Sequence, residues 1–558
     1  MNTLAPANFP ATIEVSLQPY LNWSWTISVP LLWTCAPKTP DDVVAVCNWA
    51  QQAGYQVRAR GIMHGWSPLT VTADTQAFAK VLLVDFTKYM NQITFIAAAN
   101  GQPPQAKAQT GANMDQLLTF LELQPGGSGP APGYAFAHTP APGHLTVGGV
   151  LAIDAHGTAI PVPGDQLPIS YGSLSNQILA LTAVVTDPSS PTPNGYAVKT
   201  FTRGDAEMTA LLTHAGRALI VDATLQLVDN YNLRCQSFTD IPNATLFAQP
   251  TGTTPPAQSV GAYLAASGRV EVIWYPFTAT SWLKVWTNAP TQPKGSTVVN
   301  APYNYAFSDN LPDWVTVLIK LIAQGAGNLT PKLGEFMIGF TQLSIGLSGV
   351  GDIWGPSKNT LLYVKDTTLR VTANGYAIHM KRGDVQRAIY EFTNKFTELL
   401  TAYQAKNQYP VNAPLEIRVT ALDAPDQVAA TNPGRPIISA LAQGSDDVAN
   451  GWDVAVWFDV LTLPGTPASD DFYTQLEAWI YQNYTGSYAK VLPEWSKGWA
   501  YSSEGPWTNA AVMGSIREAM TTGREGGDNW DAEVAILSKY DAGGLFTNSL
   551  LDALFVQA

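Results

Sequence analysis

Residues 31–60 hold a strand, a capped helix and a second strand, and this unit limits the possible fold more than any other stretch. The strand-like LLWTCAP precedes TPDDVVAVCNWAQQAG, where Thr39 is a typical N-cap, a proline takes the first helical position and Gly54 suits the helix end. The segment YQVRAR predicts the returning strand, which delivers Arg58 and Arg60 to a loop. The unit indicates a fold that mixes helices with sheet.

The composition is that of a globular protein with large cores. The chain has 558 residues, of which 46% are hydrophobic and 13% are charged, enough for roughly two to four domains. The net charge of -13 argues against binding to nucleic acid, because no clustered Lys and Arg would neutralise phosphates. Cys35, Cys47 and Cys235 show neither CxxC nor Cys/His spacing, so the sequence predicts no disulfide framework and no metal site.

The sequence carries no signal for membrane insertion. No uninterrupted apolar run reaches the roughly 18 to 20 residues of a transmembrane helix. The N-terminal MNTLAPANFP lacks the basic region and the apolar region of a signal peptide. Two expectations stay open on this ground, a cytoplasmic protein or one from which a leader was removed.

Small residues gather in two loops. In the first, RGIMHGWSPL, His64 follows Gly61, and a single histidine in a loop is by itself weak evidence of function. The second lies in LTVGGVLAIDAHGTAIP, with Gly148 and Gly149 at the start of a short apolar helix and Gly157 in a turn after it. Glycine turns on either side of a short helix can bring backbone N–H groups to a pyrophosphate. The two loops therefore predict a phosphate-binding site.

Beyond about residue 237 strands alternate with helices. The clearest elements are strands at 268–277, 414–423 and 452–465 and a helix at 386–404. In the strand PLEIRVTA, alternation puts Glu416 and Arg418 on one face, although a solvated ion pair is the commoner explanation of such a pattern. Asp459 stands in VAVWFDVLTL with apolar residues on both faces. A buried unpaired carboxylate is costly, so Asp459 must take a proton or find a partner.

Several of these stretches resemble the vanillyl-alcohol oxidase class of flavoproteins. The resemblance rests on RxRGxxHGWS at 58–67, PAPGHLTVGGVLAIDAHGT at 140–158 and the strand EIR at 416–418. Within that class the sequence is most similar to the class II cholesterol oxidases, which carry covalent FAD. Further stretches of the resemblance are YGSLSN (171–176), RCQSFTDIP (234–242), IWYPFT (273–278), PYNYAFSDNLP (302–312), EWSKGWA (494–500) and FTN (546–548).

The resemblance implies an α+β flavoprotein of two domains, of the vanillyl-alcohol oxidase or PCMH type. Residues 1–236 would form the FAD-binding domain, and residues 237–492 would form the sterol-binding domain, whose sheet roofs the flavin. Residues 493–558 would return to the FAD domain.

The implied reaction is hydride transfer from C3 of a 3β-hydroxysteroid to flavin N5. Reoxidation by O2 would release hydrogen peroxide, and the 5-en-3-one would isomerise to the 4-en-3-one. The implied partners are a sterol and O2, with transient contact to a membrane surface for sterol extraction. The resemblance also implies a secreted or cell-surface protein that acts as a monomer.

The resemblance assigns residues to the cofactor as well. His64 matches the histidine that bonds through a ring nitrogen to the 8α-methyl carbon of the isoalloxazine, which is reasonable chemistry for a neutral imidazole. The noncovalent contacts would come from the two loops and the C-terminus, namely Arg60, Gly61, Ile62, Met63, Gly65, Trp66, Thr146, Gly148, Gly149, Asp154, Gly157, Thr158 and Asn548.

Five residues are assigned to catalysis by the resemblance. Glu416 and Arg418 would lie at the flavin, and the arginine could swing between partners as a gate for oxygen. One of Glu271 and Glu416 would accept the hydroxyl proton while another carboxylate moves the C4 proton to C6, and the sequence leaves open which does which. Lys497 would stabilise the reduced flavin near its pyrimidine end. At Asp459 the family has asparagine, for which a protonated acid is the nearest substitute.

Two other functions stay open at this point. A covalent flavin oxidase could act on another alcohol, such as a sugar or a different lipid, and a disused flavin fold could carry a hydrophobic ligand. The role of the apolar segment 311–354 is also open, since it could belong to the core or form a lid. Such a segment is more often core than lid, yet a rigid sterol needs a long dry pocket with a mobile mouth.

Overall fold

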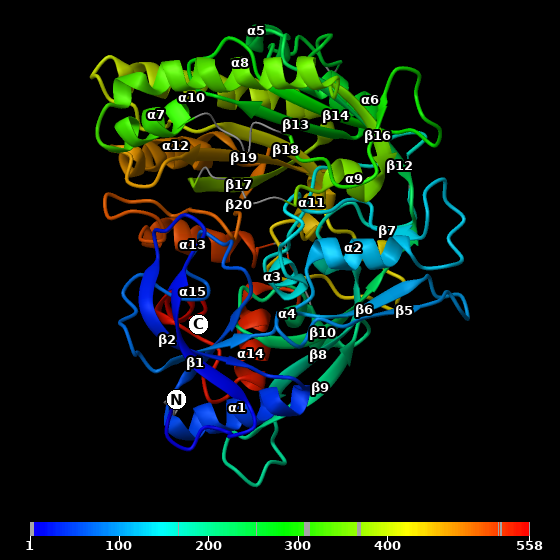
Figure 1. Cartoon of the computed structure of the whole chain (residues 1–558), viewed down its shortest axis with the longest axis vertical. Coiled ribbons are helices and arrows are strands. Elements are labelled where there is room, and N and C mark those ends of the chain that lie inside the picture. Colours follow the sequence, from blue (N-terminus) through cyan, green and yellow to red (C-terminus); the bar gives the residue numbers. More distant parts are fainter. Residues whose placement is uncertain are drawn as a thin grey trace.

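The fold combines helices with three main sheets. The computed structural model of the chain describes residues 5–165, 167–252, 254–305, 313–364, 370–522, 524 and 527–556. Figure 1 shows a lower part with a four-stranded and a five-stranded sheet, and an upper part built on a nine-stranded sheet. The α+β class predicted from the sequence is confirmed. Of the stretch PYNYAFSDNLP, residues 306–312 lie outside the described residues.

The lower part contains two separate sheets. The order β1-β2-β4-β3 joins β1 (Glu14–Leu21), β2 (Ser28–Ala36), β4 (Val81–Asp85) and β3 (Gln56–Arg60). The order β5-β6-β10-β8-β9 joins β5 (Ile93–Ile96), β6 (Gln105–Gln109), β10 (Leu219–Gln226), β8 (Ile178–Thr186) and β9 (Tyr196–Thr202). A short pair is formed by β7 (Tyr134–Ala135) and β11 (Val228–Asp229).

The helix α1 (Pro40–Ala53) joins β2 to β3, as the sequence predicts. The Thr39 side chain accepts a hydrogen bond from the backbone N–H of Asp42 at 3.1 Å, and the Asp42 carboxylate accepts from Thr39 N–H in return. This reciprocal cap satisfies N–H groups that a helix start leaves without partners. The helix ends at Gly54, whose φ of 69° lies in the left-handed region that favours glycine.

The upper part is one sheet of nine strands in the order β15-β16-β12-β14-β13-β18-β19-β17-β20. Its strands are β12 (Asn232–Phe238), β13 (Arg269–Trp274), β14 (Trp282–Asn288), β15 (Thr297–Val298), β16 (Asp352–Pro356), β17 (Thr372–Met380), β18 (Leu415–Ala421), β19 (Val454–Thr462) and β20 (Lys490–Pro493). Neighbouring strands are antiparallel except β15 and β16. The strands predicted around β13, β18 and β19 are confirmed.

Helices cover this sheet and fill the lower part. In the first half they are α2 (Met114–Glu122), α3 (Val147–Ala152), α4 (Thr209–Leu212), α5 (Asn243–Leu246) and α6 (Val260–Ser267). Later come α7 (Asp313–Ala323), α8 (Thr330–Ser348), α9 (Ser357–Leu361), α10 (Val385–Gln404), α11 (Ser445–Asn450), α12 (Ser469–Asn483), α13 (Ala510–Ala519), α14 (Trp530–Tyr540) and α15 (Ser549–Leu554). The helix predicted at 386–404 is α10, and its Phe392 ring stacks on Phe458 of β19 with centroids 3.9 Å apart.

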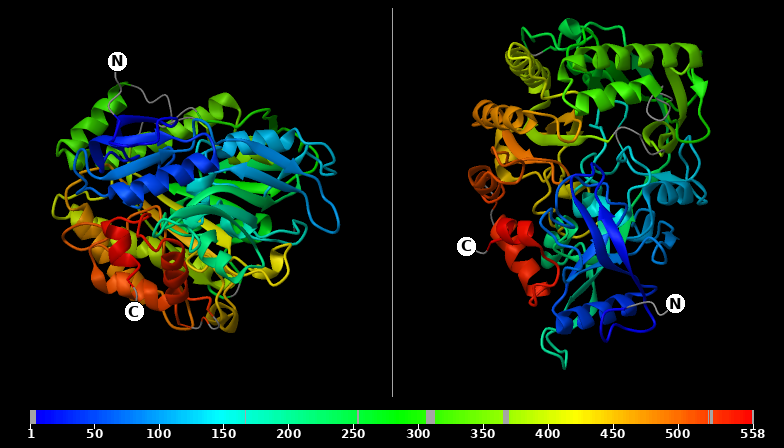
Figure 2. Two further views of the ribbon diagram at one scale, coloured as in Figure 1. Left: turned by 90° about the horizontal axis from the view of Figure 1, so that it is seen from below. Right: turned by 60° about the vertical axis from the view of Figure 1, so that its left-hand side comes forward.

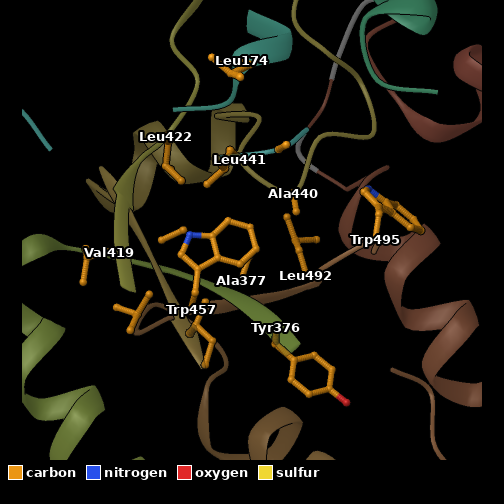
Figure 3. Close-up of a cluster of buried hydrophobic side chains, with 14 of the residues drawn as sticks. Leu174, Tyr376, Ala377, Val419, Leu422, Ala440, Leu441, Trp457, Leu492 and Trp495 are labelled. Carbon is orange, nitrogen blue, oxygen red and sulfur yellow. The ribbon is translucent and has the colours of Figure 1, made fainter. Parts of the chain in front are cut away.

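A buried tryptophan connects the nine-stranded sheet to the lower part. Figure 3 shows Trp457 of β19 packed among Leu422, Leu441 and Leu492. Its indole is fully buried, and a buried indole of this size makes many close contacts. The ring of His156, from the second glycine loop, stacks on the indole with centroids 3.7 Å apart. The loop and the sheet are therefore fixed relative to each other.

The C-terminal segment returns to the lower part of the molecule, where Figure 2 shows it beside the N-terminal sheet. The backbone N–H of Val57 in β3 donates to the carbonyl of Leu545 at 2.9 Å. Leu545 and Phe546 also pack into the apolar cluster beneath α1. Residues from the C-terminal segment and from the N-terminal sheet therefore share one hydrophobic core.

Two observations complete the comparison with the sequence. All three cysteines are buried and free. No helix of the described residues is both long enough and apolar enough to cross a membrane.

Candidate active site

A cavity of about 580 Å³ lies between the lower part and the nine-stranded sheet. Both glycine loops line it from below, and β13, β18 and α8 line it from above. This position agrees with the predicted sheet that roofs the site. Its size falls within the range usual for pockets that hold a cofactor or a drug-sized ligand.

The first glycine loop presents free backbone donors to the cavity. The N–H groups of Ile62, Met63, His64 and Gly65 have no acceptor within the part of the chain that the structure describes. All four residues line the cavity, and Met63 has a φ of 59°. A run of N–H groups around a left-handed residue forms a concave site that attracts anions. The loop therefore offers an arrangement of donors that suits an anionic group such as a phosphate.

The second glycine loop supplies space rather than donors. The N–H of Gly148 donates to the Thr110 carbonyl at 3.0 Å, and that of Gly149 donates to Thr146 Oγ1 at 3.3 Å. A methyl group added at Gly61 would lie only 2.5 Å from Thr146 Oγ1, so the two loops touch there. The glycines allow this close approach, and the amides of Gly148 and Gly149 are already used by the protein.

Two residues that the resemblance assigns to the cofactor do not line the cavity. Asp154 is buried and accepts hydrogen bonds from the N–H of Ala440 and from Ser439 Oγ. Asn548 caps α15 and donates to the carbonyl of Pro68 at 3.0 Å. Both side chains therefore connect segments of the backbone, and their expected contact with the cofactor is not supported by their positions.

The remaining cofactor candidates line the cavity, some with a second task. Arg60 donates to Gln18 Oε1 at 2.8 Å, and Trp66 donates through its indole to the Val371 carbonyl at 2.6 Å. Thr158 donates to the Val270 carbonyl at 2.6 Å, which attaches the second loop to β13. Arg58 directs its guanidinium to the carbonyls of Leu69 and Thr70, so it supports the fold rather than a phosphate.

His64 differs from the other two histidines that line the cavity. The Nδ1 atom of His214 accepts from two backbone N–H groups, and that of His156 bonds to the Gly157 carbonyl at 2.9 Å. The Nδ1 atom of His64 is buried with no hydrogen-bond partner among the described residues. Burial, together with the positive field of its neighbours, lowers the pKa of His64 to about 3. Its ring is therefore a neutral imidazole whose Nδ1 makes no hydrogen bond to the described residues.

Strand register assembles a charged cluster on the cavity side of the sheet. Glu271 of β13 lies directly across from Arg418 of β18, and Glu416 of β18 lies across from Asp459 of β19. Arg418 donates to Glu271 and Asp459 at 2.8 Å each, and to Glu416 at 2.6 Å. The predicted shared face of Glu416 and Arg418 is confirmed, and one guanidinium holds three carboxylates.

Lys284 is a second cation of this cluster that the sequence did not single out. It lies across from Glu271 in β14, and its Nζ is 3.2 Å from Glu271 Oε2. Burial opposes the ionised form of Glu271, but Lys284 and Arg418 outweigh it and lower its pKa to about 2. Glu271 is therefore a firmly ionised, doubly paired carboxylate.

Lys497 forms the third cationic point of the cluster. Its ammonium contacts Asp459 and lies 3.1 Å from Glu494 Oε1. Lys497 and Glu494 line the cavity, whereas Asp459 lies behind Arg418 and Lys497 and does not. Two cations therefore separate Asp459, which the resemblance assigns to catalysis, from the cavity.

The rest of the upper wall is apolar. The cavity beyond the charged cluster is lined by Ile273 of β13, Tyr275 just after that strand, Trp282 of β14 and Leu461 of β19. Met337 of α8 adds to this wall. The apolar segment 311–354 thus packs one face into the core and also borders the cavity, except for its first residues 311–312, which are outside the described residues.

Comparison with known families identifies both parts of the chain. Residues 32–187 match the model of an FAD-binding domain. Residues 232–556 match the model of the substrate-binding domain of cholesterol oxidase. The chain belongs to the cholesterol oxidase family. As a member of this family it is a flavin-dependent enzyme that oxidises cholesterol, which also confirms the resemblance noted in the sequence.

Solved structures agree with this assignment. A solvent-stable cholesterol oxidase is 45% identical, with a TM-score of 0.93, and the match covers 99% of this chain and all of that one. Cholesterol oxidase from Brevibacterium sterolicum is 38% identical over the full length of both chains, also with a TM-score of 0.93. Glucooligosaccharide oxidase from Acremonium strictum, at 14% identity and a TM-score of 0.57, shares the fold alone. The comparison with curated proteins returned no match.

The residues of this cholesterol oxidase fit the FAD that the family uses. The N–H groups of residues 62–65 offer the anion site that a pyrophosphate needs, and His64 lines the same cavity while its Nδ1 has no hydrogen-bond partner among the described residues. Bound FAD would supply the acceptor for the hydride and electrons of the sterol. The chain itself supplies the pocket, the charged cluster and the apolar wall.

Two residues of this site were missed in the sequence. Glu494 stands three positions before Lys497 in EWSKGW, and Lys284 stands between apolar residues in WLKVWTN. An inward-facing lysine in a buried strand was a signal for Lys284, because such a charge requires a partner. The position of Glu494 depends on the pairing of β20 with β17, which no local pattern reveals.

Proposed function

We propose that this cholesterol oxidase tethers its FAD through His64 and uses Glu416 to accept the proton of the sterol 3β-hydroxyl. The observation that carries the proposal is a charged cluster next to the apolar part of the cavity's upper wall, in a cavity also lined by a histidine whose Nδ1 has no partner among the described residues. A sterol has the matching shape, with one hydroxyl at the end of a rigid apolar body.

Glu416 is the favoured base because it has the fewest partners. Among the residues that the structure describes, it pairs only with Arg418, at 2.6 Å, and it lines the cavity. Glu271 is held by Lys284 and Arg418, and Asp459 lies behind Arg418 and Lys497. A base must reach the proton that it removes, and geometry comes before basicity in such an assignment. When Glu416 takes the hydroxyl proton, the hydride at C3 leaves to the flavin and a ketone forms.

The same carboxylate cluster would serve the isomerisation. The 5-en-3-one loses a proton at C4 and gains one at C6, so no net oxidation takes place in this step. Glu271 and Glu416 both face the cavity, and a carboxyl that has accepted the hydroxyl proton can return one to carbon. O2 would reoxidise the flavin and leave as hydrogen peroxide.

The proposal includes a route for the sterol. Outward-facing apolar residues are found on the two helices above the cavity in Figure 1, and they are Val317 and Leu321 of α7 and Leu343 and Leu347 of α8. Because α8 also borders the cavity through Met337, the exposed apolar face and the cavity wall belong to the same helix. We expect a secreted monomer that touches a sterol-bearing membrane through this face.

The His64→Ala variant tests the tether. We expect it to fold and bind FAD, but to release yellow flavin into the supernatant after acid precipitation and to oxidise sterol more slowly. The reason is that the variant keeps the anion site of residues 62–65 and loses only the covalent bond. The measurement is flavin absorbance in pellet and supernatant, together with the mass of the intact protein.

His144→Ala is the matched control for this variant. The His144 ring lies 5.5 Å from that of His64, yet His144 does not line the cavity. It should therefore keep its flavin in the pellet. Flavin that stays attached in His64→Ala would rule out His64 as the attachment point.

The Arg418→Lys variant tests the predicted oxygen gate. Lysine keeps the charge but cannot hold Glu271, Glu416 and Asp459 at once, because it lacks the planar fork of arginine. We expect reoxidation by O2 to slow by about tenfold, a barrier change of about 1.4 kcal/mol, and anaerobic reduction by sterol to slow less. Stopped-flow absorbance measures the two half-reactions separately.

Arg234→Lys is the control, since Arg234 makes a bidentate pair with Asp352 in the same sheet away from the cavity. Both of its half-reactions should be unchanged. Equal losses of the two half-reactions in Arg418→Lys would contradict a gating role.

A further inference from the structure

The carboxyl groups of Asp459 and Glu494 are buried near Lys497, next to a glycine of the sheet. Gly375 of β17 lies directly across from Asp459 of β19. A methyl group added at Gly375 would lie 2.5 Å from Asp459 Oδ1 and 2.8 Å from Glu494 Oε2. Only glycine leaves this space to the two carboxyl groups, whose Oδ1 and Oε2 atoms both border it.

Each carboxyl group has one satisfied and one unsatisfied oxygen. Asp459 Oδ2 accepts from Arg418 at 2.8 Å and contacts Lys497, and Glu494 Oε1 lies 3.1 Å from Lys497. Asp459 Oδ1 and Glu494 Oε2 are buried without a donor among the described residues. If both groups were ionised, two buried anionic oxygens would face each other, which is a costly arrangement.

We propose that Asp459 and Glu494 share one proton between Oδ1 and Oε2, and that Glu494 thereby acts as a positioning residue for Lys497. A proton at this point gives both unsatisfied oxygens a partner and leaves Oδ2 and Oε1 free to accept their existing bonds. An asparagine at this position could donate an amide N–H to Glu494 in the same way. The shared proton does not depend on where the flavin is attached or on which residue is the base.

The surrounding charges favour one negative charge on the pair rather than two. The charged or titratable groups that surround it are Arg418, Glu416, Glu271, Lys284, Lys497, His156 and Asp154. Burial raises the pKa of Asp154 well above its usual range, so this acid adds no charge near neutral pH. His156 is neutral, because burial lowers its pKa to about 3. Arg418, Lys284 and Lys497 carry three positive charges. Glu271, Glu416 and a single negative charge on the Asp459–Glu494 pair balance them.

The proton should be lost near neutral pH. Burial, and next the charge of Glu494, raise the pKa of Asp459 to about 7 against the opposing effect of Lys497 and Arg418. Below this pH the pair carries one negative charge. Above it, two carboxylates hold Lys497, so less of its positive charge acts on the cavity that it lines.

The proton itself can be observed by infrared difference spectroscopy of the holoenzyme across a pH step from 6 to 8. The wild type should show the carbonyl band of a protonated carboxylic acid that titrates near pH 7. Asp459→Asn and Glu494→Gln should each remove the same band, because the remaining acid gains an amide donor and ionises. The double variant should remove no more than either single variant.

Glu477→Gln is the matched control. Glu477 is another buried acid whose pKa is raised to about 7 by burial, and it bonds to Tyr376 and to two backbone N–H groups elsewhere. The band lost in Glu477→Gln should add to the band lost in Asp459→Asn or in Glu494→Gln. If Asp459→Asn and Glu494→Gln removed different bands that added up in the double variant, the acids would hold separate protons and the shared proton would be refuted. Absence of a titrating band in the wild type would refute it as well.

A kinetic measurement tests the role of the pair toward the cavity, and it rests on the proposed function. The rate of anaerobic flavin reduction in the wild type should fall above pH 7, whereas in Asp459→Asn this fall should disappear. Near pH 7 the Asn variant should stay within about tenfold of the wild type, or about 1.4 kcal/mol in barrier. If the variant instead lost several orders of magnitude at every pH while binding FAD and sterol, Asp459 would have to work as an ionised base. The infrared result would stand independently of that outcome.

Discussion

The Glu416→Gln variant should bind FAD normally and yet be reduced by sterol about 10²- to 10⁴-fold more slowly than the wild type, the usual contribution of a positioned general base. The amide has the shape of the carboxylate and can still accept a hydrogen bond from Arg418. It cannot accept the hydroxyl proton. The effect should therefore appear in the rate of anaerobic flavin reduction measured at saturating sterol.

Glu271→Gln is the comparison that makes this prediction specific. Glu271 sits on the same face of the sheet and touches the same arginine, but Lys284 also holds it. Its lowered pKa, of about 2, makes it the weaker base of the two. We expect a smaller loss of flavin reduction in this variant. Suppose instead that the rate of flavin reduction fell more in Glu271→Gln, while Glu416→Gln stayed within about tenfold of the wild type. Glu271 would then be the general base in place of Glu416.

The charged cluster could be predicted from the sequence to the extent that it follows from strand alternation. Side chains alternate between the two faces of a strand, which placed Glu416 and Arg418 on one face. Asp459 lies among apolar residues, so its carboxylate required a partner or a proton. Both inferences are local to a strand. The register that sets Glu271 against Arg418, and Glu416 against Asp459, is a property of three strands that are separated in the chain.

Loop membership alone did not predict which polar side chains reach the cavity. Asp154 stands in the second glycine loop between residues that do line it, but its carboxylate turns to the backbone of Ala440. Asn548 belongs to a stretch of the resemblance, yet it caps α15. In both cases a buried N–H or carbonyl elsewhere in the fold needed a partner, and such a need is visible only in three dimensions.

The same limit applies to the anion site. Glycines drew attention to both loops, but the available donors belong to residues 62–65, where Met63 takes a left-handed conformation. In the second loop the first amides already bond within the protein. Glycine content indicates where a backbone can approach a ligand, whereas the direction of each N–H decides what it can bind.

The second large effect concerns stability, and it arises where the lower part meets the sheet that carries the cluster. Arg269 of β13 is fully buried and forms an ion pair with Asp165. Asp165 also accepts from Asn288 at 3.2 Å, and the guanidinium lies over the rings of Tyr171 and Tyr231. Arg269 stands two residues before Glu271, so this pair sets the position of the strand that lines the cavity.

Arg269→Met should lower the free energy of unfolding of the holoenzyme by about 3–5 kcal/mol, because it leaves the Asp165 carboxylate buried without its partner. The double variant Arg269→Met/Asp165→Asn removes both charges and should regain most of the loss. Arg234→Met, which breaks the more exposed pair with Asp352, should cost at most about 1 kcal/mol. Urea unfolding followed by tryptophan fluorescence and flavin absorbance measures all three. If the double variant were as unstable as Arg269→Met, the loss would come from missing packing of the guanidinium against the two tyrosine rings, and the uncompensated charge would not be its cause.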